Sequence, residues 1–98
     1  MTRYRVLFLR RAKREYALAL AWWRQNRPAA PTLLRGEARA ARKLLAEQPY
    51  VGAVDPQHAL RRLLLTETGY HFYYRIHEDE RVVEILAIWH VSRDTPRI

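Results

Sequence analysis

The segment from residue 70 to residue 77 carries the side chains of this sequence that are best suited to chemistry. Its polar residues alternate with apolar ones, so a strand would place the polar set on one face. That set is His71, Tyr73, Arg75 and His77. Such a face can stack on bases and contact phosphate, and histidines can ligate a metal. The chain has no cysteine and no carboxylate at ligand spacing from these histidines, so we expect neither a metal nor a cofactor.

The whole chain is strongly basic. Its 98 residues carry 18 lysines and arginines against 10 acidic residues, which gives a formal net charge of +8. A small domain with this balance usually meets an acidic partner such as nucleic acid, an anionic surface or an acidic protein segment. Only Lys13 and Lys43 are lysines. The preference for arginine has two explanations: its forked guanidinium suits phosphate and carboxylate, or the coding sequence is GC-rich.

Three predicted strands position this chemistry. Apolar and polar residues alternate within residues 60–90, and the pattern breaks at residues 66–69 and 77–80. Both breaks contain residues typical of tight turns, which predicts an antiparallel meander of three strands. In the simplest register of this meander, Arg75 and His90 would share a concave face.

A strand and two helices are predicted before the meander. Residues 3–9 form a strand that is apolar on both sides, which favours a place inside the sheet or beneath a helix. Arg10–Asn26 has apolar residues at the three- and four-residue spacing of a helix. A second helix is predicted to start near Pro28 or Pro31 and to end near Gln48.

The remaining segment, residues 49–59, is predicted to be a loop. The element order is then β-α-α-β-β-β, an α+β fold in which a helical hairpin packs on a small, mainly antiparallel sheet. We expect residues 1–98 to form a single domain. No stretch is apolar for long enough to cross a bilayer or to form a signal peptide, so we expect a cytoplasmic protein without a membrane partner.

The first predicted helix carries more large apolar side chains than one core face needs. A surplus of this kind favours a surface that binds a helix of a partner protein. The alternative is that both tryptophans belong to the core. The residues predicted for the partner-binding surface are Tyr16, Leu18, Trp22 and Trp23.

Three motifs carry a family resemblance over nearly the whole chain. They are LRRL at residues 60–63, GYHFYYRI at residues 69–76 and VEILAIWHVSR at residues 83–93. Together they resemble the RelE/ParE superfamily of bacterial toxins from type II toxin–antitoxin modules. The resemblance implies a cognate antitoxin protein whose flexible segment wraps the toxin, and therefore a hetero-oligomer.

The resemblance implies one of two activities. RelE-like toxins cut messenger RNA in the ribosome without a metal, whereas ParE-like toxins inhibit DNA gyrase and lack a nuclease site. A nuclease needs groups that activate the 2′-hydroxyl, stabilise the phosphorane and protonate the leaving oxygen. On this resemblance, Arg75 would stabilise charge and His90 would act as the general acid. The candidate catalytic residues are Arg61, Arg75, His90 and Arg93.

Departures from the nuclease pattern favour the ParE type. The meander has no lysine, no tyrosine follows Tyr74, and residues 60–65 include no acid. We therefore predict a toxin that binds a target such as DNA gyrase, with His90 making a structural hydrogen bond at its strand end. A RelE-like endoribonuclease is the alternative, and a non-toxic module that binds nucleic acid is the second alternative. The predicted contacts with the target or with nucleic acid are Arg61, Arg62, Tyr73, Arg75 and Arg93.

Overall fold

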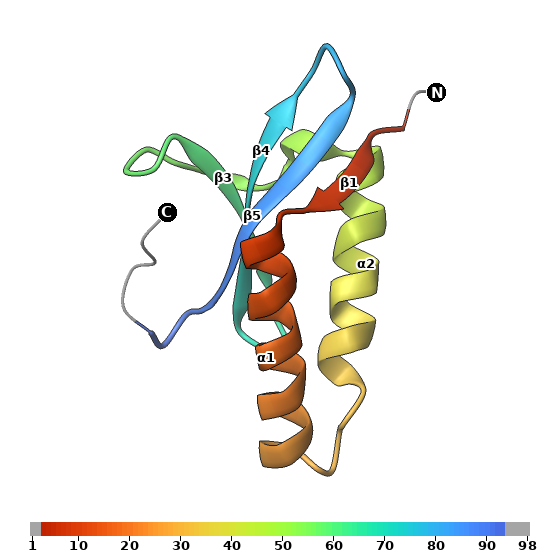
Figure 1. Cartoon of the computed structure of the whole chain (residues 1–98), viewed down its shortest axis with the longest axis vertical. Helices are drawn as coiled ribbons and strands as arrows, with labels where there is room; N and C mark the ends of the chain where they lie inside the picture. The colour runs from red at the N-terminus through yellow and green to blue at the C-terminus, as the bar shows by residue number, and fades with distance from the viewer. Residues whose placement is uncertain (1–2, 94–98) are drawn as a thin grey trace.

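The computed structural model describes residues 3–93, in which two helices cover one face of a five-stranded sheet (Figure 1). The elements in chain order are β1 (Arg5–Phe8), α1 (Arg10–Asn26), α2 (Leu33–Glu47), the 3₁₀ helix η1 (Pro49–Val51), β2 (Ala53–Asp55), β3 (Leu60–Leu65), β4 (Tyr70–His77) and β5 (Val82–His90). The strand order is β1-β5-β4-β3-β2, with β1 parallel to β5 and the other neighbours antiparallel. The predicted α+β fold is confirmed. Within residues 3–93, no helix is long and apolar enough to cross a membrane.

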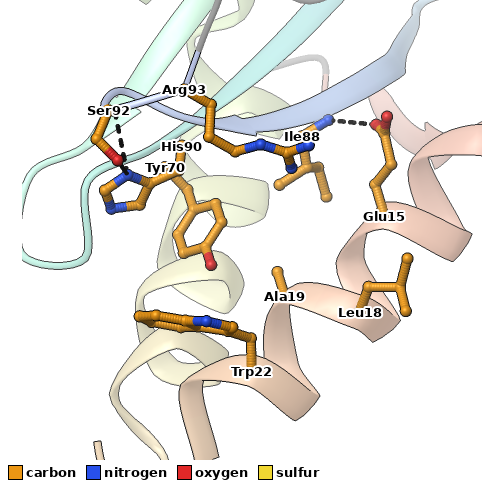
Figure 2. Close-up of a pocket in the computed structure, with 9 residues that line it drawn as sticks. All are labelled: Glu15, Leu18, Ala19, Trp22, Tyr70, Ile88, His90, Ser92 and Arg93. Carbon is orange, nitrogen blue, oxygen red and sulfur yellow. Dashed lines mark hydrogen bonds between the residues drawn. The ribbon is translucent and has the colours of Figure 1, made fainter. Parts of the chain in front are cut away.

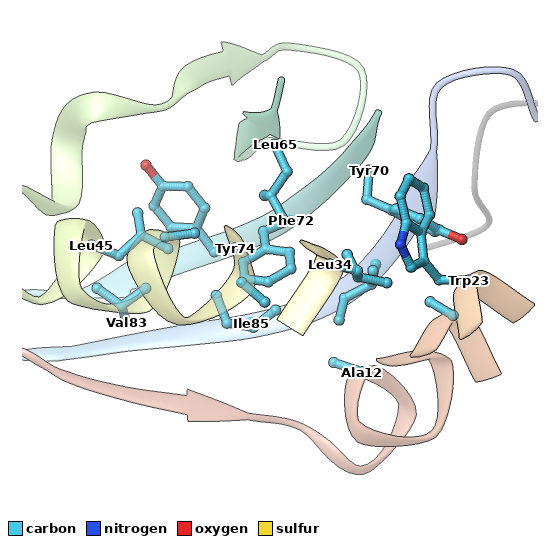
Figure 3. Close-up of a cluster of buried hydrophobic side chains, with 14 residues drawn as sticks. Ala12, Trp23, Leu34, Leu45, Leu65, Tyr70, Phe72, Tyr74, Val83 and Ile85 are labelled. Carbon is cyan, nitrogen blue, oxygen red and sulfur yellow. The ribbon is translucent and has the colours of Figure 1, made fainter. Parts of the chain in front are cut away.

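The core lies between the helices and the inner face of the sheet (Figure 3). Each helix buries one apolar stripe, and alternate residues of the strands meet it. Phe72 and Tyr74 of β4 and Val83 and Ile85 of β5 are fully buried. The other buried members of this cluster are Ala12, Ala19, Trp23, Leu34, Ala38, Ala41, Leu45, Leu65, Tyr70 and Ile88.

The segment predicted to be a loop contains η1 and the edge strand β2, so that prediction was wrong in part. Tyr74 holds the segment to the sheet, because its hydroxyl donates to the Pro49 carbonyl at 2.7 Å and accepts from the Gly52 N–H at 2.9 Å. Arg61 adds to this hold by donating to the carbonyl oxygens of Tyr50, at 3.2 Å, and Gly52, at 2.9 Å. Both holding side chains come from other strands, which the local residue pattern does not reveal.

Two further features of the N-terminal half differ from the prediction. Helix α2 begins at Leu33, two residues after Pro31, so neither proline lies in its first turn and both lie in turns that precede it. Strand β1 lies at the edge of the sheet, so its predicted place inside the sheet was wrong. Its Phe8 side still packs on the core beneath the helices, whereas Leu7 on the other side is exposed.

Candidate functional site

A groove of about 520 Å³ opens between α1 and the end of β5 (Figure 2). One wall is a side of α1, and the other is formed by the end of β5 and the start of β4. Because both walls pack on the core, the fold fixes the shape of the groove. This α1–β5 groove is lined by Glu15, Leu18, Ala19, Trp22, Tyr70, Ile88, His90, Ser92 and Arg93.

The α1 wall carries large apolar side chains that reach solvent. Leu18 is 67% exposed and Trp22 is 45% exposed, and their four-residue spacing places them on one side of the helix. Trp23 points into the core instead, where it is buried and its Nε1–H donates to the Ala30 carbonyl at 2.8 Å. Trp23 was therefore wrongly placed in the exposed surface. Tyr16 is half-buried and lines a different groove, between α1 and α2.

Glu15 joins the two walls of the groove. Its Oε1 accepts from the backbone N–H of Ile88 at 2.9 Å, and its Oε2 accepts from Arg11 Nε at 3.0 Å. Strand β1 pairs only with residues 82–85 of β5, so β1 does not reach the N–H of Ile88. The carboxylate replaces a neighbouring strand as the acceptor. One side of the groove is therefore a sheet edge where the backbone hydrogen bond is made to a side chain and not to a neighbouring strand.

His90 holds the end of β5 in place. Its Nε2 lies 3.1 Å from the Thr68 carbonyl oxygen, and its Nδ1 lies 2.8 Å from the Ser92 Oγ. A carbonyl only accepts, so Nε2 carries the hydrogen and Nδ1 accepts from the Ser92 hydroxyl. The ring also meets Tyr70 edge-on, with centroids 4.9 Å apart. Both ring nitrogens make hydrogen bonds within the protein, as the structural interpretation of His90 predicts.

Arg75 lies far from His90. The register places Glu84 opposite Arg75 and Tyr70 opposite His90. Five residues along β4 therefore separate the two sites, about 17 Å at the rise of a strand. The two side chains also face opposite sides of the sheet, since His90 shares the inner side with Tyr70. The predicted concave face was wrong, because the turn after His77 sets a register that brings Glu84 to Arg75.

Two of the exposed arginines predicted as contacts, Arg75 and Arg93, have local partners. Arg75 Nη2 lies 3.0 Å from Glu84 Oε1, and His77 Nε2 lies 3.1 Å from the same oxygen. The hydrogen bond with His77, followed by that with Arg75, lowers the pKa of Glu84. Arg93 stacks on Trp89, with its Cζ 4.0 Å from the ring centroid. A ligand that recruits Arg75 must therefore compete with a carboxylate.

The outer face of the sheet, opposite the helices, is less open than the sequence suggests. Tyr73 is 5% exposed and has the rings of His58 and His71 beside it, with centroids at 6.2 and 5.8 Å. Its predicted place as an accessible contact was therefore wrong. Asp55 Oδ2 lies 2.8 Å from His58 Nδ1, and this hydrogen bond lowers the pKa of Asp55. Burial, followed by the charge of Arg62, lowers the pKa of His71.

The predicted contact residues do not form one surface. Arg62 is exposed on the outer face with Arg75, whereas Arg61 lies opposite Tyr74 on the inner side and holds η1. Arg93 lies in the α1–β5 groove. Among residues 3–93, no three histidine, aspartate or glutamate side chains gather in a way that could hold a metal ion.

Sequence reasoning missed several lining residues of the α1–β5 groove. Glu15 had a detectable signal, because it precedes Leu18 by three residues and Trp22 by seven and so shares their side of α1. Tyr70, Ile88 and Ser92 come from the sheet end, and no pattern within α1 points to them. The missed residues are Glu15, Ala19, Tyr70, Ile88 and Ser92.

The helical hairpin on a five-stranded sheet is a fold that this chain shares with solved structures of ParE and RelE toxins. The chain is similar to the chromosomal ParDE system from P. aeruginosa, with a TM-score of 0.72, 18% identity and coverage of 90% of this chain and 96% of that one. It is similar to the RelBE2 complex from Mycobacterium tuberculosis, with a TM-score of 0.65, 22% identity and coverage of 95% and 97%. For an E. coli RelE mutant the TM-score is 0.61, the identity 18% and the coverage 91% and 84%. A comparison with curated proteins gave no match.

The family model described as the ParE toxin of the type II toxin–antitoxin system parDE matches residues 6–95. The chain therefore belongs to the ParE toxin family, and the predicted membership of the RelE/ParE superfamily is confirmed.

Proposed function

We propose that this toxin stops growth by binding its target, with DNA gyrase as that target, and not by hydrolysis. The observation that carries the proposal is the absence of a convergent acid–base pair among the candidate residues. His90 uses both ring nitrogens within the protein, and Arg75 lies about 17 Å away along the sheet in an ion pair with Glu84. The match to the ParE family model supports the same proposal. Gyrase as target implies action in the cytoplasm.

The second part of the proposal concerns the antitoxin, which would form a hetero-oligomer with this chain. The RelBE2 relative was solved as a toxin–antitoxin complex, and the P. aeruginosa relative is described as a ParDE toxin–antitoxin system. In this chain the α1–β5 groove offers what an amphipathic segment needs. Leu18 and Trp22 expose apolar surface at four-residue spacing, and Arg93 at the far side can meet a carboxylate. A bound antitoxin helix would lie along α1 with its apolar side on these two residues.

RelE-like cleavage of messenger RNA is the second candidate, because the fold is shared with RelE structures and a fold alone does not choose an activity. It would have to use Arg61, Arg75, His90 and Arg93 in another arrangement than the one observed. A non-toxic module that binds nucleic acid is the third candidate, favoured by the net charge of +8.

Induced expression of the full chain in bacteria separates the three candidates. We expect growth arrest with induction of the DNA-damage response, no codon-specific cleavage of messenger RNA, and relief by the small protein encoded beside the toxin. Purified toxin should inhibit the supercoiling activity of gyrase. Codon-specific cleavage without inhibition of gyrase would instead establish the RelE-like activity. Normal growth with folded protein in the cell would leave only the nucleic-acid module.

His90→Gln is the matched variant for this test. A general acid contributes about 10²- to 10⁴-fold to a rate, so a nuclease would lose most of its cleavage. The gyrase proposal predicts that the purified variant still inhibits supercoiling, because the role of His90 is to hold the end of β5 in place. Circular dichroism of the variant checks that the sheet remains folded.

A further inference from the structure

A second groove lies on the other side of α1, between α1 and α2. It encloses about 350 Å³ and is separate from the α1–β5 groove, since the two share no lining residue. We call it the arginine groove. It is lined by Tyr16, Leu20, Arg35, Ala38, Arg39 and Arg42.

Helix α2 places the three arginines in a row. Arg35, Arg39 and Arg42 follow the four- and three-residue spacing of one helix side, and all three are exposed. Seven residues of helix span about 10 Å. Arg42 is held in place from below, because its Cζ lies 5.3 Å from the centroid of the Phe8 ring. The row is therefore a linear array of positive charge on a rigid support.

No carboxylate of residues 3–93 neutralises this row. Five of the acids bind elsewhere: Glu15, Glu37, Glu47, Asp55 and Glu84 contact Ile88, Thr68, Arg3, His58 and Arg75, respectively. The other four lie in the two tight turns of the meander, at residues 67 and 78–80. None of these nine acids lines the arginine groove. The cations of the groove are thus free to meet an external anion.

The floor of the arginine groove favours an extended anion over an amphipathic peptide. None of the large apolar side chains that the described chain exposes lies in it, and its own apolar residues, Leu20 and Ala38, are half-buried and buried, so a peptide would find no large exposed anchor there. Along the helix axis, one strand of DNA presents a phosphate about every 3.4 Å, so the row covers the axial rise of about three phosphates. Burial raises the pKa of Tyr16 although the arginines oppose the change, so its hydroxyl stays protonated and can donate to a phosphate oxygen.

We propose that the arginine groove binds the phosphodiester backbone of nucleic acid without regard to sequence. This activity is independent of toxicity and of gyrase. Three arginine–phosphate contacts contribute about 2.7 to the slope of log K against log salt for a DNA duplex. Between 50 and 200 mM salt, a variant without these contacts should therefore lose about 40-fold less affinity than the wild type loses.

The test uses the purified full chain and a fluorescent 20-bp duplex of arbitrary sequence. The affinity for the duplex is measured by fluorescence anisotropy at salt concentrations from 50 to 200 mM. The variant R35Q/R39Q/R42Q should lower the salt slope by about 2.7, and R35K/R39K/R42K should keep it, since lysine also neutralises phosphate. The matched control is R5Q/R14Q/R81Q, which removes the same charge from exposed positions outside the groove. Thermal unfolding shows that each variant is folded.

The outcomes are distinct. A slope change confined to the groove variant supports the proposal. Equal slope changes in the groove and control variants would mean diffuse attraction by net charge, and the proposal would be wrong. The proposal would also be wrong if the groove variant kept its DNA slope but lost binding to labelled poly-glutamate, because the groove would then serve an acidic protein. Gyrase inhibition is assayed separately, so a failure of the gyrase proposal would not change the outcome of the DNA-binding test.

Discussion

Truncation of the two exposed apolar residues in the α1–β5 groove should weaken antitoxin binding by a calculable amount. Trp22 exposes 45% of its surface, about 100 Å² of a side chain that can bury about 220 Å². Complete cover of that area contributes about 2.5 kcal/mol. Leu18 exposes 67% of its surface, and covering it contributes about 1.5 kcal/mol. The double variant Leu18→Ala/Trp22→Ala should therefore raise Kd by about 1,000-fold, and Trp22→Ala alone by about 70-fold.

Isothermal titration calorimetry with the antitoxin encoded beside the toxin measures this loss. Leu64→Ala is the matched control, because Leu64 is also exposed, at 43%, but lies on the outer face of the sheet and outside the groove. The fold should tolerate the Trp22 change, which removes the contact of Arg27 Cζ with the ring at 5.4 Å and costs about 0.5–1 kcal/mol of stability.

The result that refutes this reasoning is a double variant whose Kd stays within about twofold of the wild type while its unfolding curve shows a native fold. The exposed Leu18–Trp22 surface would then serve another purpose, and the antitoxin would bind elsewhere. A loss of affinity in Leu64→Ala that equals the loss in the double variant would also count against the groove, because binding would then not depend on its apolar wall.

Three further predictions concern the scaffold. Tyr74→Phe leaves the buried Pro49 carbonyl and Gly52 N–H without their side-chain partner and should lower the free energy of unfolding by about 2–4 kcal/mol in urea titrations. Gly36→Ala should raise the free energy of unfolding by about 0.5–1 kcal/mol and the thermal midpoint by about 2–8 °C, because glycine within a helix is less stable than alanine. The added methyl group fits, since nothing lies within 4 Å of it. Because folding lowers the pKa of Glu84, its stabilising contribution is present above the pKa of the unfolded chain and is lost as pH falls through the folded pKa. Urea midpoints of wild type and Glu84→Gln should therefore differ at pH 7 and converge toward pH 3.

Local patterns predicted the long elements well. Arg10–Asn26 was predicted with the bounds that α1 has, because its apolar spacing is helical and a proline follows soon after its end. The alternation of residues 70–77 likewise predicted β4. A three-residue strand such as β2 has too few residues to show a period. It forms because Tyr74 and Arg61, which are distant in sequence, bind the backbone beside it.

Features that depend on the sheet order could not be predicted from local patterns. The place of β1 at an edge follows from its pairing with β5, which lies more than 70 residues away. An irregularity between Tyr73 and Tyr74 shifts the register of β4 against β5. This register, together with the covering histidines, decides which arginines and aromatics remain accessible. The candidate site was therefore predicted by residue type on α1, where the period is local, whereas at the sheet end His90 and Arg93 were named and Tyr70, Ile88 and Ser92 were missed.

Helix α1 keeps the two binding surfaces apart. Its buried stripe, which includes Ala12, Ala19 and Trp23, faces the core, and the groove residues lie on opposite flanks of that stripe because successive residues turn by about 100°. Leu18 and Trp22 belong to one flank, and Tyr16 with Leu20 belongs to the other. An antitoxin helix in the α1–β5 groove would therefore leave the arginine groove uncovered. Since none of the acids of residues 3–93 lines the arginine groove, filling the first groove adds none of these carboxylates to the second, and a toxin–antitoxin complex should keep the positive row that the free toxin presents.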